Sequence, residues 1–361
     1  MASYSTLIRL PSLLRFALIW VIALQSLDVI AQEMTKADVK QSVKSIASVV
    51  DRHYFDIAMA NQIREELESE LANGAYENVA SIKTLADRVT ATMFKLTRDK
   101  HLVVWPQKRR STNSGKPVSK ITEAEASAQR EAQRAIDGKR ENFGIQKFEL
   151  LPGNIAYLSF SSFYRDYEIR EILAAQMKLA ANADAVILDM RTNMGGSTTA
   201  VALLASYFFE GPKRKLFDVV PRNGKTTSYF TDPSIQNRNG SRPVYVLVQP
   251  STFSGGEGLA FILQDQKRAK VIGERTAGAA NPGRPYAANS LFEVNVPNGQ
   301  IKAAIGGGNW EGKGVKPDID SMGEDALNVA QRTALTELIG SAEDKSYKTK
   351  LGSLLRQLLP E

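Results

Sequence analysis

Two histidines and no cysteine limit the chemistry open to this 361-residue chain. The histidines are His53, in Asp51-Arg-His-Tyr-Phe55, and His101, in Thr97-Arg-Asp-Lys-His101. Without cysteine there are no disulfides, and thiol catalysis and cysteine-ligated metals are excluded. Two isolated histidines with no His-Glu-x-x-His pattern also make zinc improbable, so we expect neither a metal nor a cofactor.

A general base that works near neutral pH is usually a histidine, so these two residues are the candidates. His53 stands at the end of an amphipathic helical pattern, where packing at a helix end is the preferred interpretation. His101 precedes the apolar run Leu102-Val-Val-Trp105. A capping or loop role is also open to His101, and the spacing alone does not decide between the two.

Two glycine-rich turns follow apolar runs that are typical of buried strands. They are Asp189-Met-Arg-Thr-Asn-Met-Gly-Gly196 and Ser251-Thr-Phe-Ser-Gly-Gly-Glu257, and a helix-like stretch follows each. In a parallel sheet, ligands bind where strand ends meet helix starts, because free amides point there. Ser254 would have such amides beside it, which could hold an oxyanion. The spacing supports equally a simple helix cap at Ser254, with glycines that only form turns.

The order of these residues along the chain excludes two common serine-hydrolase designs. An α/β-hydrolase has Gly-x-Ser-x-Gly and a histidine that follows the serine. Here Thr-Phe-Ser-Gly-Gly surrounds Ser254, and no histidine follows His101. A chymotrypsin-like barrel is built from strands alone, whereas this chain alternates strand-like and helix-like segments after Phe143.

The elements that must position these residues change in character along the chain. After Phe143 we expect strands at 155–160, 185–189, 244–248 and 270–273, and helices at 167–181, 198–209 and 255–266. This alternation predicts an α/β fold with a mostly parallel sheet covered on both faces. Residues 291–296 and 301–305 suggest a late β-hairpin around Pro297-Asn-Gly299. From Asp325 onward the pattern is helical again.

The segment before the sheet is different. Between Ala37 and Leu96, apolar residues recur at helical spacing and predict three amphipathic helices. Residues 107–142 are polar and basic, with one exposed helix possible at 123–136, and are expected to form a linker or flap. We therefore expect five segments: a signal peptide (1–31), a helical N-terminal domain (32–105), a polar linker or flap (106–142), an α/β core (143–340) and a helical tail (341–361).

The beginning of the chain predicts export. Arg9 and Arg15 precede the apolar run 16–24, and a short stretch of residues with small or modest side chains ends at Ala31. Together these features resemble a secretory signal peptide. The run is shorter than the roughly 20 residues of a spanning helix. We expect a periplasmic or secreted protein with no stable membrane anchor after cleavage. The net charge is +7, and the basic residues are scattered along the chain apart from the cluster Lys108-Arg109-Arg110. Nucleic-acid binding is therefore not expected.

Several ordered motifs together resemble the tail-specific or carboxyl-terminal processing serine peptidases. The resemblance is to the branch that includes tricorn protease and the repeats of interphotoreceptor retinoid-binding protein, over about residues 37–340. Beside the two glycine-rich turns, the matching segments are Asn142-Phe-Gly-Ile with Leu151-Pro-Gly-Asn-Ile-Ala-Tyr157, Arg268-Ala-Lys-Val-Ile-Gly-Glu-Arg-Thr-Ala-Gly278, and Asn309-Trp-Glu-Gly-Lys-Gly-Val-Lys-Pro-Asp318. The resemblance implies a ββα-spiral (crotonase-like) core behind an N-terminal helical bundle.

The same resemblance implies a nucleophile and an oxyanion hole. Ser254 matches the nucleophilic serine of the family. The amide of Gly255, with that of Gly195 or Gly196, matches the oxyanion hole. No segment between His101 and the core is long and apolar enough for a PDZ domain.

The two branches of the family differ in the general base. The processing branch uses a lysine in Thr-Phe-Gly-Lys, but the matching stretch here is Thr276-Ala-Gly-Ala279. The tricorn-like branch uses a histidine from the preceding domain and a glutamate late in the core, which match His101 and Glu311. Lys100 stands where tricorn has a serine beside the histidine.

The resulting expectation is a serine endopeptidase that hydrolyses peptides or proteins through an acyl-enzyme. A neutral imidazole would accept the proton of Ser254, and a carboxylate on its far nitrogen would fix the tautomer. Two alternatives remain on the same fold. One is a noncatalytic module that binds apolar, retinoid-like or lipid-like ligands, and the other is a crotonase-like acyl-thioester enzyme.

Overall fold

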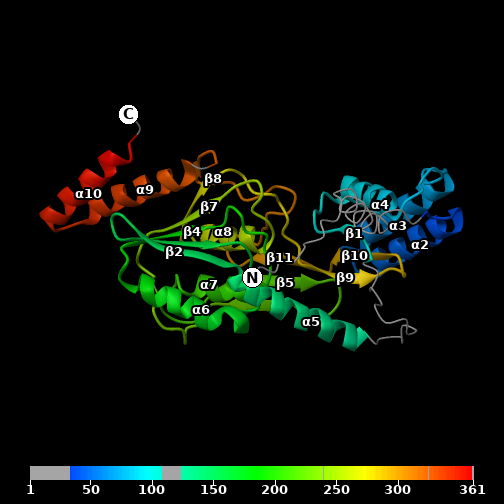
Figure 1. Ribbon diagram of the computed structural model, residues 1–361, viewed down its shortest axis with the longest axis horizontal. Coiled ribbons are helices and arrows are strands. Elements are labelled where there is room, and N and C mark those ends of the chain that lie inside the picture. The colour runs from blue at the N-terminus through cyan, green and yellow to red at the C-terminus, as the bar shows by residue number, and fades with distance from the viewer. Residues whose placement is uncertain (1–32, 108–122, 239, 324, 360–361) are drawn as a thin grey trace, which may run out of the picture.

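The computed structural model describes residues 33–107, 123–238, 240–323 and 325–359. These residues form a helical part and an α/β part, which lie at opposite ends of the molecule in Figure 1. The expected signal peptide at 1–31 lies outside the described residues. Within the ranges given above, no helix combines the length and the apolar character needed to cross a membrane.

Three helices form most of the helical part, as the apolar spacing predicts: α2 (Lys36–His53), α3 (Ile57–Ala72) and α4 (Ile82–Thr97). Each begins at a residue whose side chain accepts an amide of the first turn, namely Thr35, Asp56 and Ser81. The predicted apolar stripes are buried against one another in a single core. After α4 the chain turns at Arg98, in the left-handed conformation (φ 59°), and enters the loop that carries His101.

A six-stranded sheet forms the centre of the α/β part. Its strands, in spatial order, are β12 (Ile319–Asp320), β8 (Lys270–Gly273), β7 (Val244–Val248), β4 (Ala185–Asp189), β3 (Ile155–Phe160) and β2 (Ile145–Leu151). All neighbours pair in parallel except β2, which is antiparallel to β3. The prediction of a mostly parallel sheet is confirmed, as are the four predicted strands.

Both faces of this sheet are covered, because successive side chains of each strand point to opposite faces. Leu158 and Leu188 belong to the core that contains α6 (Asp166–Leu179), α7 (Thr198–Ser206) and α8 (Gly255–Asp265). Tyr157 and Ile187 belong to the core that contains α9 (Asp325–Ser341) and α10 (Lys345–Gln357). With both faces buried, the polar groups of the sheet are accessible mainly at the strand ends.

The predicted late hairpin is wrong. Strands β10 (Phe292–Pro297) and β11 (Gly299–Ala303) both form, but they belong to different sheets. Only Asn298 separates them, which is shorter than the two-residue loop of a tight hairpin. Strand β11 instead pairs with β5 (Lys215–Pro221), which also pairs with β6 (Thr227–Phe230).

Strand β10 fastens the helical part to the rest of the chain. It pairs with β1 (Val103–Pro106) and β9 (Gly283–Ala287). Its apolar face, formed by Phe292, Val294 and Val296, lies in the core of α2, α3 and α4. The loop between α4 and β1 is thereby held beside residues that come from late in the sequence.

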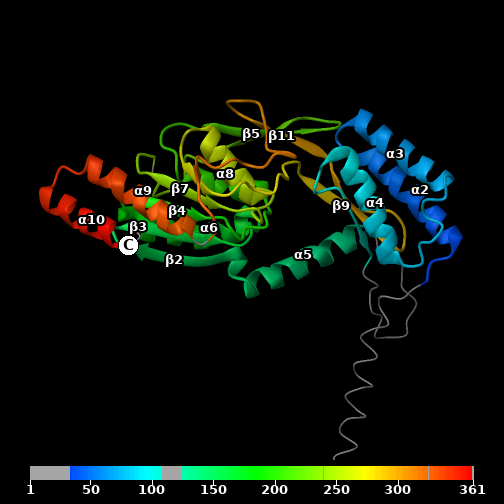
Figure 2. The ribbon, with the colours of Figure 1, turned by 90° about the horizontal axis from the view of Figure 1, so that it is seen from above.

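Helix α5 (Glu123–Arg140) lies in the polar segment, where an exposed helix is expected at 123–136. Figure 2 shows α5 running from the α/β part toward the helical part. The side chain of Arg134 stacks over the ring of Tyr164, at 5.6 Å from the ring centroid.

Candidate active site

Ser254 and the glycine pair lie at the carboxyl ends of adjacent strands. Ser254 follows β7, and Gly195 and Gly196 follow β4, which is the neighbour of β7 in the sheet. The two turns are hydrogen bonded to each other, because the Phe253 amide donates to the Asn193 carbonyl at 2.9 Å. They therefore form one continuous surface at the amino ends of α7 and α8.

The backbone at Ser254 has a conformation that few non-glycine residues adopt, with φ 50° and ψ −116°. The carboxylate of Glu257 accepts the Ser254 amide at 2.9 Å and helps to hold this conformation. A Cβ atom on Gly195 would lie 2.6 Å from the Cβ of Ser254, so the facing turn needs glycine there. Strained residues of this kind cluster at functional sites, where the surrounding structure enforces them.

His101 brings its imidazole to Ser254 from the helical part. Its Nε2 lies 3.0 Å from the Oγ of Ser254, although the two residues are 153 positions apart in sequence. On β10, Asn295 donates through its side-chain amide to the His101 carbonyl at 2.7 Å and fixes the loop. Burial lowers the pKa of His101 to about 4, so the imidazole is neutral at neutral pH. A neutral imidazole is the form that can accept the serine proton.

The other histidine is placed elsewhere. His53 lies at the end of α2 and stacks on the ring of Tyr286, with ring centroids 3.9 Å apart. This agrees with the packing role that its position in the sequence indicates.

The backbone amides beside Ser254 differ in availability. The Gly195 amide donates to the Asn193 side chain at 2.8 Å and is therefore occupied. In the described part of the chain, the amides of Gly196 and Gly255 have no acceptor. A Cβ built on Gly255 would lie 3.2 Å from the Gly196 nitrogen, so these two glycines are close together. Gly196 and Gly255 are thus the available pair of amides.

Glu311 lies close to this centre but is anchored to a different segment. Its Oε2 accepts the amides of Ala280 and Asn281 at 2.7 and 3.0 Å. Its Oε1 is buried without a partner among the described residues. No hydrogen bond joins Glu311 to His101 or to Ser254 in the described ranges. Burial first, and then the charge of Asp99, raise the pKa of Glu311.

Two buried acids near the site were not singled out from the sequence. Asp99 is 1% exposed and accepts the His101 amide at 2.9 Å. Glu257 is 0% exposed and accepts the amides of Gly278 and Ala279 as well as that of Ser254. Each has a sequence signal, since Asp99 stands two residues before the histidine and Glu257 stands three after the serine, as in a capping box.

A cleft of about 600 Å³ opens onto the serine, the imidazole and the two available amides. Ser254, His101, Gly196 and Gly255 line it together. Its other walls are largely apolar, from Val201, Phe217, Phe253, Ile262, Ile301 and Trp310.

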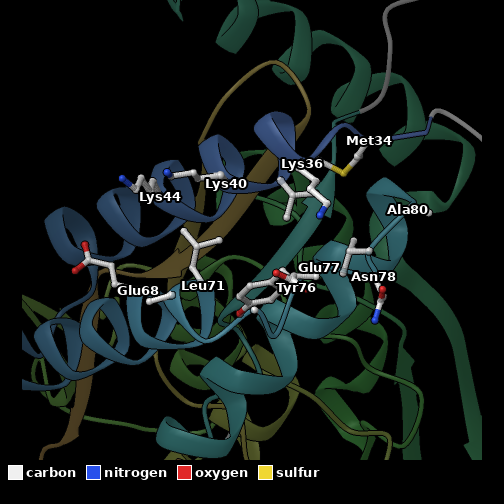
Figure 3. Close-up of a pocket in the computed structure, with 14 residues that line it drawn as sticks. Met34, Lys36, Lys40, Lys44, Glu68, Leu71, Tyr76, Glu77, Asn78 and Ala80 are labelled. Carbon is white, nitrogen blue, oxygen red and sulfur yellow. The ribbon is translucent and has the colours of Figure 1, made fainter.

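A second groove, of about 990 Å³, lies on the helical part between α2 and the chain after α3. Figure 3 shows Lys36, Lys40 and Lys44 in a row along α2, with Leu71 and Tyr76 facing them. This groove is lined by no histidine and no serine, so it offers no nucleophile beside a base. The smaller cleft is the candidate active site.

An α/β fold that places a serine hydroxyl, an imidazole and two free amides around one cleft has the arrangement of a serine hydrolase. Residues 154–321 match peptidase family S41, and residues 24–137 match the N-terminal domain of peptidase S41 in eukaryotic IRBP.

Curated relatives are similar over part of their length. The tail-specific protease of Haemophilus influenzae is 29% identical over 185 residues, which are 48% of this chain and 26% of that protein. The carboxyl-terminal-processing protease of Synechocystis is 32% identical over 146 residues, which are 40% of this chain and 31% of that protein. The chain thus matches between about a quarter and a third of the length of these two relatives.

A solved structure shows the same fold. The photosystem II D1 C-terminal processing protease is similar with a TM-score of 0.50 and 18% identity, over 81% of this chain and 94% of that one. The expected α/β core of the ββα-spiral type behind a helical N-terminal region is confirmed.

Proposed function

We propose that the protein is a serine endopeptidase that cleaves peptide bonds of peptides or proteins through an acyl-enzyme. Ser254 is the nucleophile and His101 is the general base. The observation that carries the proposal is the 3.0 Å separation of His101 Nε2 and Ser254 Oγ, beside two amides without acceptors. The match of residues 154–321 to peptidase family S41 supports it.

The chemistry follows from these positions. Neutral His101 accepts the hydroxyl proton as Ser254 Oγ attacks the carbonyl carbon of the scissile bond. The amides of Gly196 and Gly255 donate to the oxygen that becomes negative. The imidazolium then returns the proton to the leaving amine, and the acyl-enzyme forms. Water deprotonated by the same imidazole hydrolyses the ester and restores Ser254.

Glu311 supports the site through the backbone. Its carboxyl group holds the amides of Ala280 and Asn281 in place, and Ala280 lines the cleft. In this proposal it shapes the wall of the cleft beside the imidazole.

The proposal also covers location. The basic head, short apolar run and small-residue end of residues 1–31 support export to the periplasm or the outside. Export of the chain would bring the cleft to substrates outside the cytoplasm.

Labelling with a fluorophosphonate tests the nucleophile. We expect one adduct, located by peptide mass on Ser254, and no adduct in Ser254→Ala. That variant should also lose about three orders of magnitude or more in kcat/KM against an unfolded protein substrate. Ser197→Ala, which removes another hydroxyl from the cleft, is the matched control and should label normally.

The same experiment tests the alternative function, a noncatalytic site for apolar ligands, which the apolar walls of the cleft would suit. Absence of labelling in the folded wild-type protein, together with binding of a fluorescent fatty acid, would support that alternative and overturn the proposal.

A further inference from the structure

Asp99 is the carboxylate most closely tied to His101. Its Oδ1 accepts the backbone amide of His101 at 2.9 Å and lies 4.0 Å from the imidazole Nδ1. Its Oδ2 accepts the hydroxyl of Tyr54 at 3.3 Å and the side-chain amide of Asn281 at 3.5 Å. Asp99 therefore joins three segments: the end of α2, the loop of His101, and the chain after β8.

Two acids lie near the imidazole. One ring nitrogen of His101 and one oxygen each of Asp99 and Glu311 lie within 4.8 Å of one another. Of the two acids, only Asp99 has an oxygen within 4.0 Å of a ring nitrogen in the described part of the chain. The Nδ1 of His101 is buried and has no hydrogen-bond partner there. The nearer acceptor for a proton on Nδ1 is thus Asp99.

Two buried carboxyl groups this close do not ionise independently, because each disfavours the charge of the other. Burial raises the pKa of both. Hydrogen bonds to a carboxylate oppose this effect, and Asp99 accepts three whereas Glu311 accepts two. Asp99 is therefore the group that retains a negative charge, and Glu311 is the group that holds a proton.

Other charged groups near His101 are engaged elsewhere. The Nζ of Lys100 donates to the Ala277 carbonyl at 2.7 Å. Glu257 accepts hydrogen bonds from Thr276, Gly278, Ala279 and Ser254. Tyr54 is neutral, since burial and the charge of Asp99 raise its pKa. None of these groups replaces Asp99 beside the Nδ1 of His101.

We propose that Asp99 is the positioning residue of His101 and holds the negative charge that faces its Nδ1. It keeps Nδ1 protonated, so that the lone pair of Nε2 points to Ser254, and it stabilises the imidazolium that forms during attack. Glu311 remains neutral and shapes the 280–281 segment. This inference rests on the proposed role of His101 as the base.

The variants Asp99→Asn and Glu311→Gln test it, because each keeps the shape of the group and replaces the acid with an amide that cannot ionise. The chain has two histidines, so a histidine labelled with ¹³C at Cε1 gives two signals, which His53→Gln assigns. The titration of each signal reports the imidazole pKa whether or not the protein is an active enzyme. The pH profile of kcat/KM is measured in parallel.

At neutral pH, where Asp99 is ionised, we expect Asp99→Asn to shift the His101 signal, because the charge that favours a proton on Nδ1 is lost. It should lower kcat about 10²-fold or more with little change in KM. Glu311→Gln should leave the His101 signal unchanged at the same pH. The reverse pattern, or an inactive Asp99→Asn whose His101 signal equals that of the wild type, overturns the proposal.

The two proposals can fail separately. A wild-type protein that neither cleaves substrate nor reacts with fluorophosphonate contradicts the peptidase function. In that case a shift of the His101 signal in Asp99→Asn would still establish that Asp99 carries the charge beside the imidazole, while its effect on catalysis would be refuted.

Discussion

At the scale of single residues, burial keeps the imidazole beside Ser254 uncharged. His101 is largely enclosed, and Phe253 lies against it with ring centroids 4.9 Å apart. A cation is disfavoured in such surroundings, so the pKa falls from the ordinary 6.5 to about 4. The imidazole is then neutral at neutral pH and able to accept a proton.

This predicts an acidic limb with two steps. Activity should fall first as Asp99 is protonated, at a pKa of about 6, because the charge beside the imidazole is lost. It should then be abolished as the pH drops through the pKa of His101, about 4, because only the neutral imidazole accepts the serine proton. The measurement is kcat/KM for a peptide substrate between pH 3 and pH 9. His101→Ala should abolish the activity and the limb together.

Lys100→Gln is the control for this prediction. It removes the neighbouring cation, which is directed to the Ala277 carbonyl, and should retain most of the activity. Loss of activity in Lys100→Gln, with His101→Ala fully active, would make a lysine the base and refute the assignment.

At the scale of elements, β10 determines whether the histidine reaches the serine. This strand pairs with β1, just after the His101 loop, and Asn295 on it binds the His101 carbonyl. Its apolar side chains are buried among the helices of the N-terminal part. Packing of a late strand against early helices therefore sets the distance between His101 and Ser254.

Phe292→Ala should loosen this connection. Phe292 is 0% exposed, and truncation of a buried phenylalanine costs about 3–5 kcal/mol. Denaturant unfolding followed by circular dichroism measures the loss in the free energy of unfolding. Phe230→Ala, at a site that is 37% exposed, is the matched control and should cost much less. Equal losses in the two variants would contradict this role for β10.

At the scale of the whole molecule, two parts share one cleft. Ser254 and the available amides come from the α/β part, and the imidazole and Asp99 come from the loop after α4. Because neither part holds the complete set, the proposed activity requires both.

Export is predicted from the first residues of the chain. If residues 1–31 are removed during secretion, the intact mass of the protein recovered from the cell envelope or the medium should correspond to a chain that begins at Gln32. Replacing Arg9 and Arg15 with glutamate should reduce export, because the basic head of the signal is lost. A full-length chain found only in the cytosol would contradict the prediction.

Most helices and strands could be predicted from local patterns, because each depends on the spacing of apolar residues within a single segment. The stripes of α2 to α4, the buried strands and the two glycine-rich turns were predictable for this reason, and a resemblance between ordered motifs indicated Ser254, His101 and Glu311. The partner of β10 was not predictable. Its alternating pattern is compatible with any sheet. Only the tertiary structure shows that β10 and β11, which a single residue separates, belong to different sheets.

Tertiary structure also decided which polar groups are free. Gly195 and Gly196 are equivalent in sequence, but a hydrogen bond to Asn193 occupies one amide and leaves the other. Asp99 and Glu311 are both acids, but their pKa values depend on burial and on partners that lie far away in the chain. The sequence by itself determined which residues could do the chemistry. Which of these residues are placed for that chemistry depends on distances and on desolvation, because both arise only when distant segments pack together.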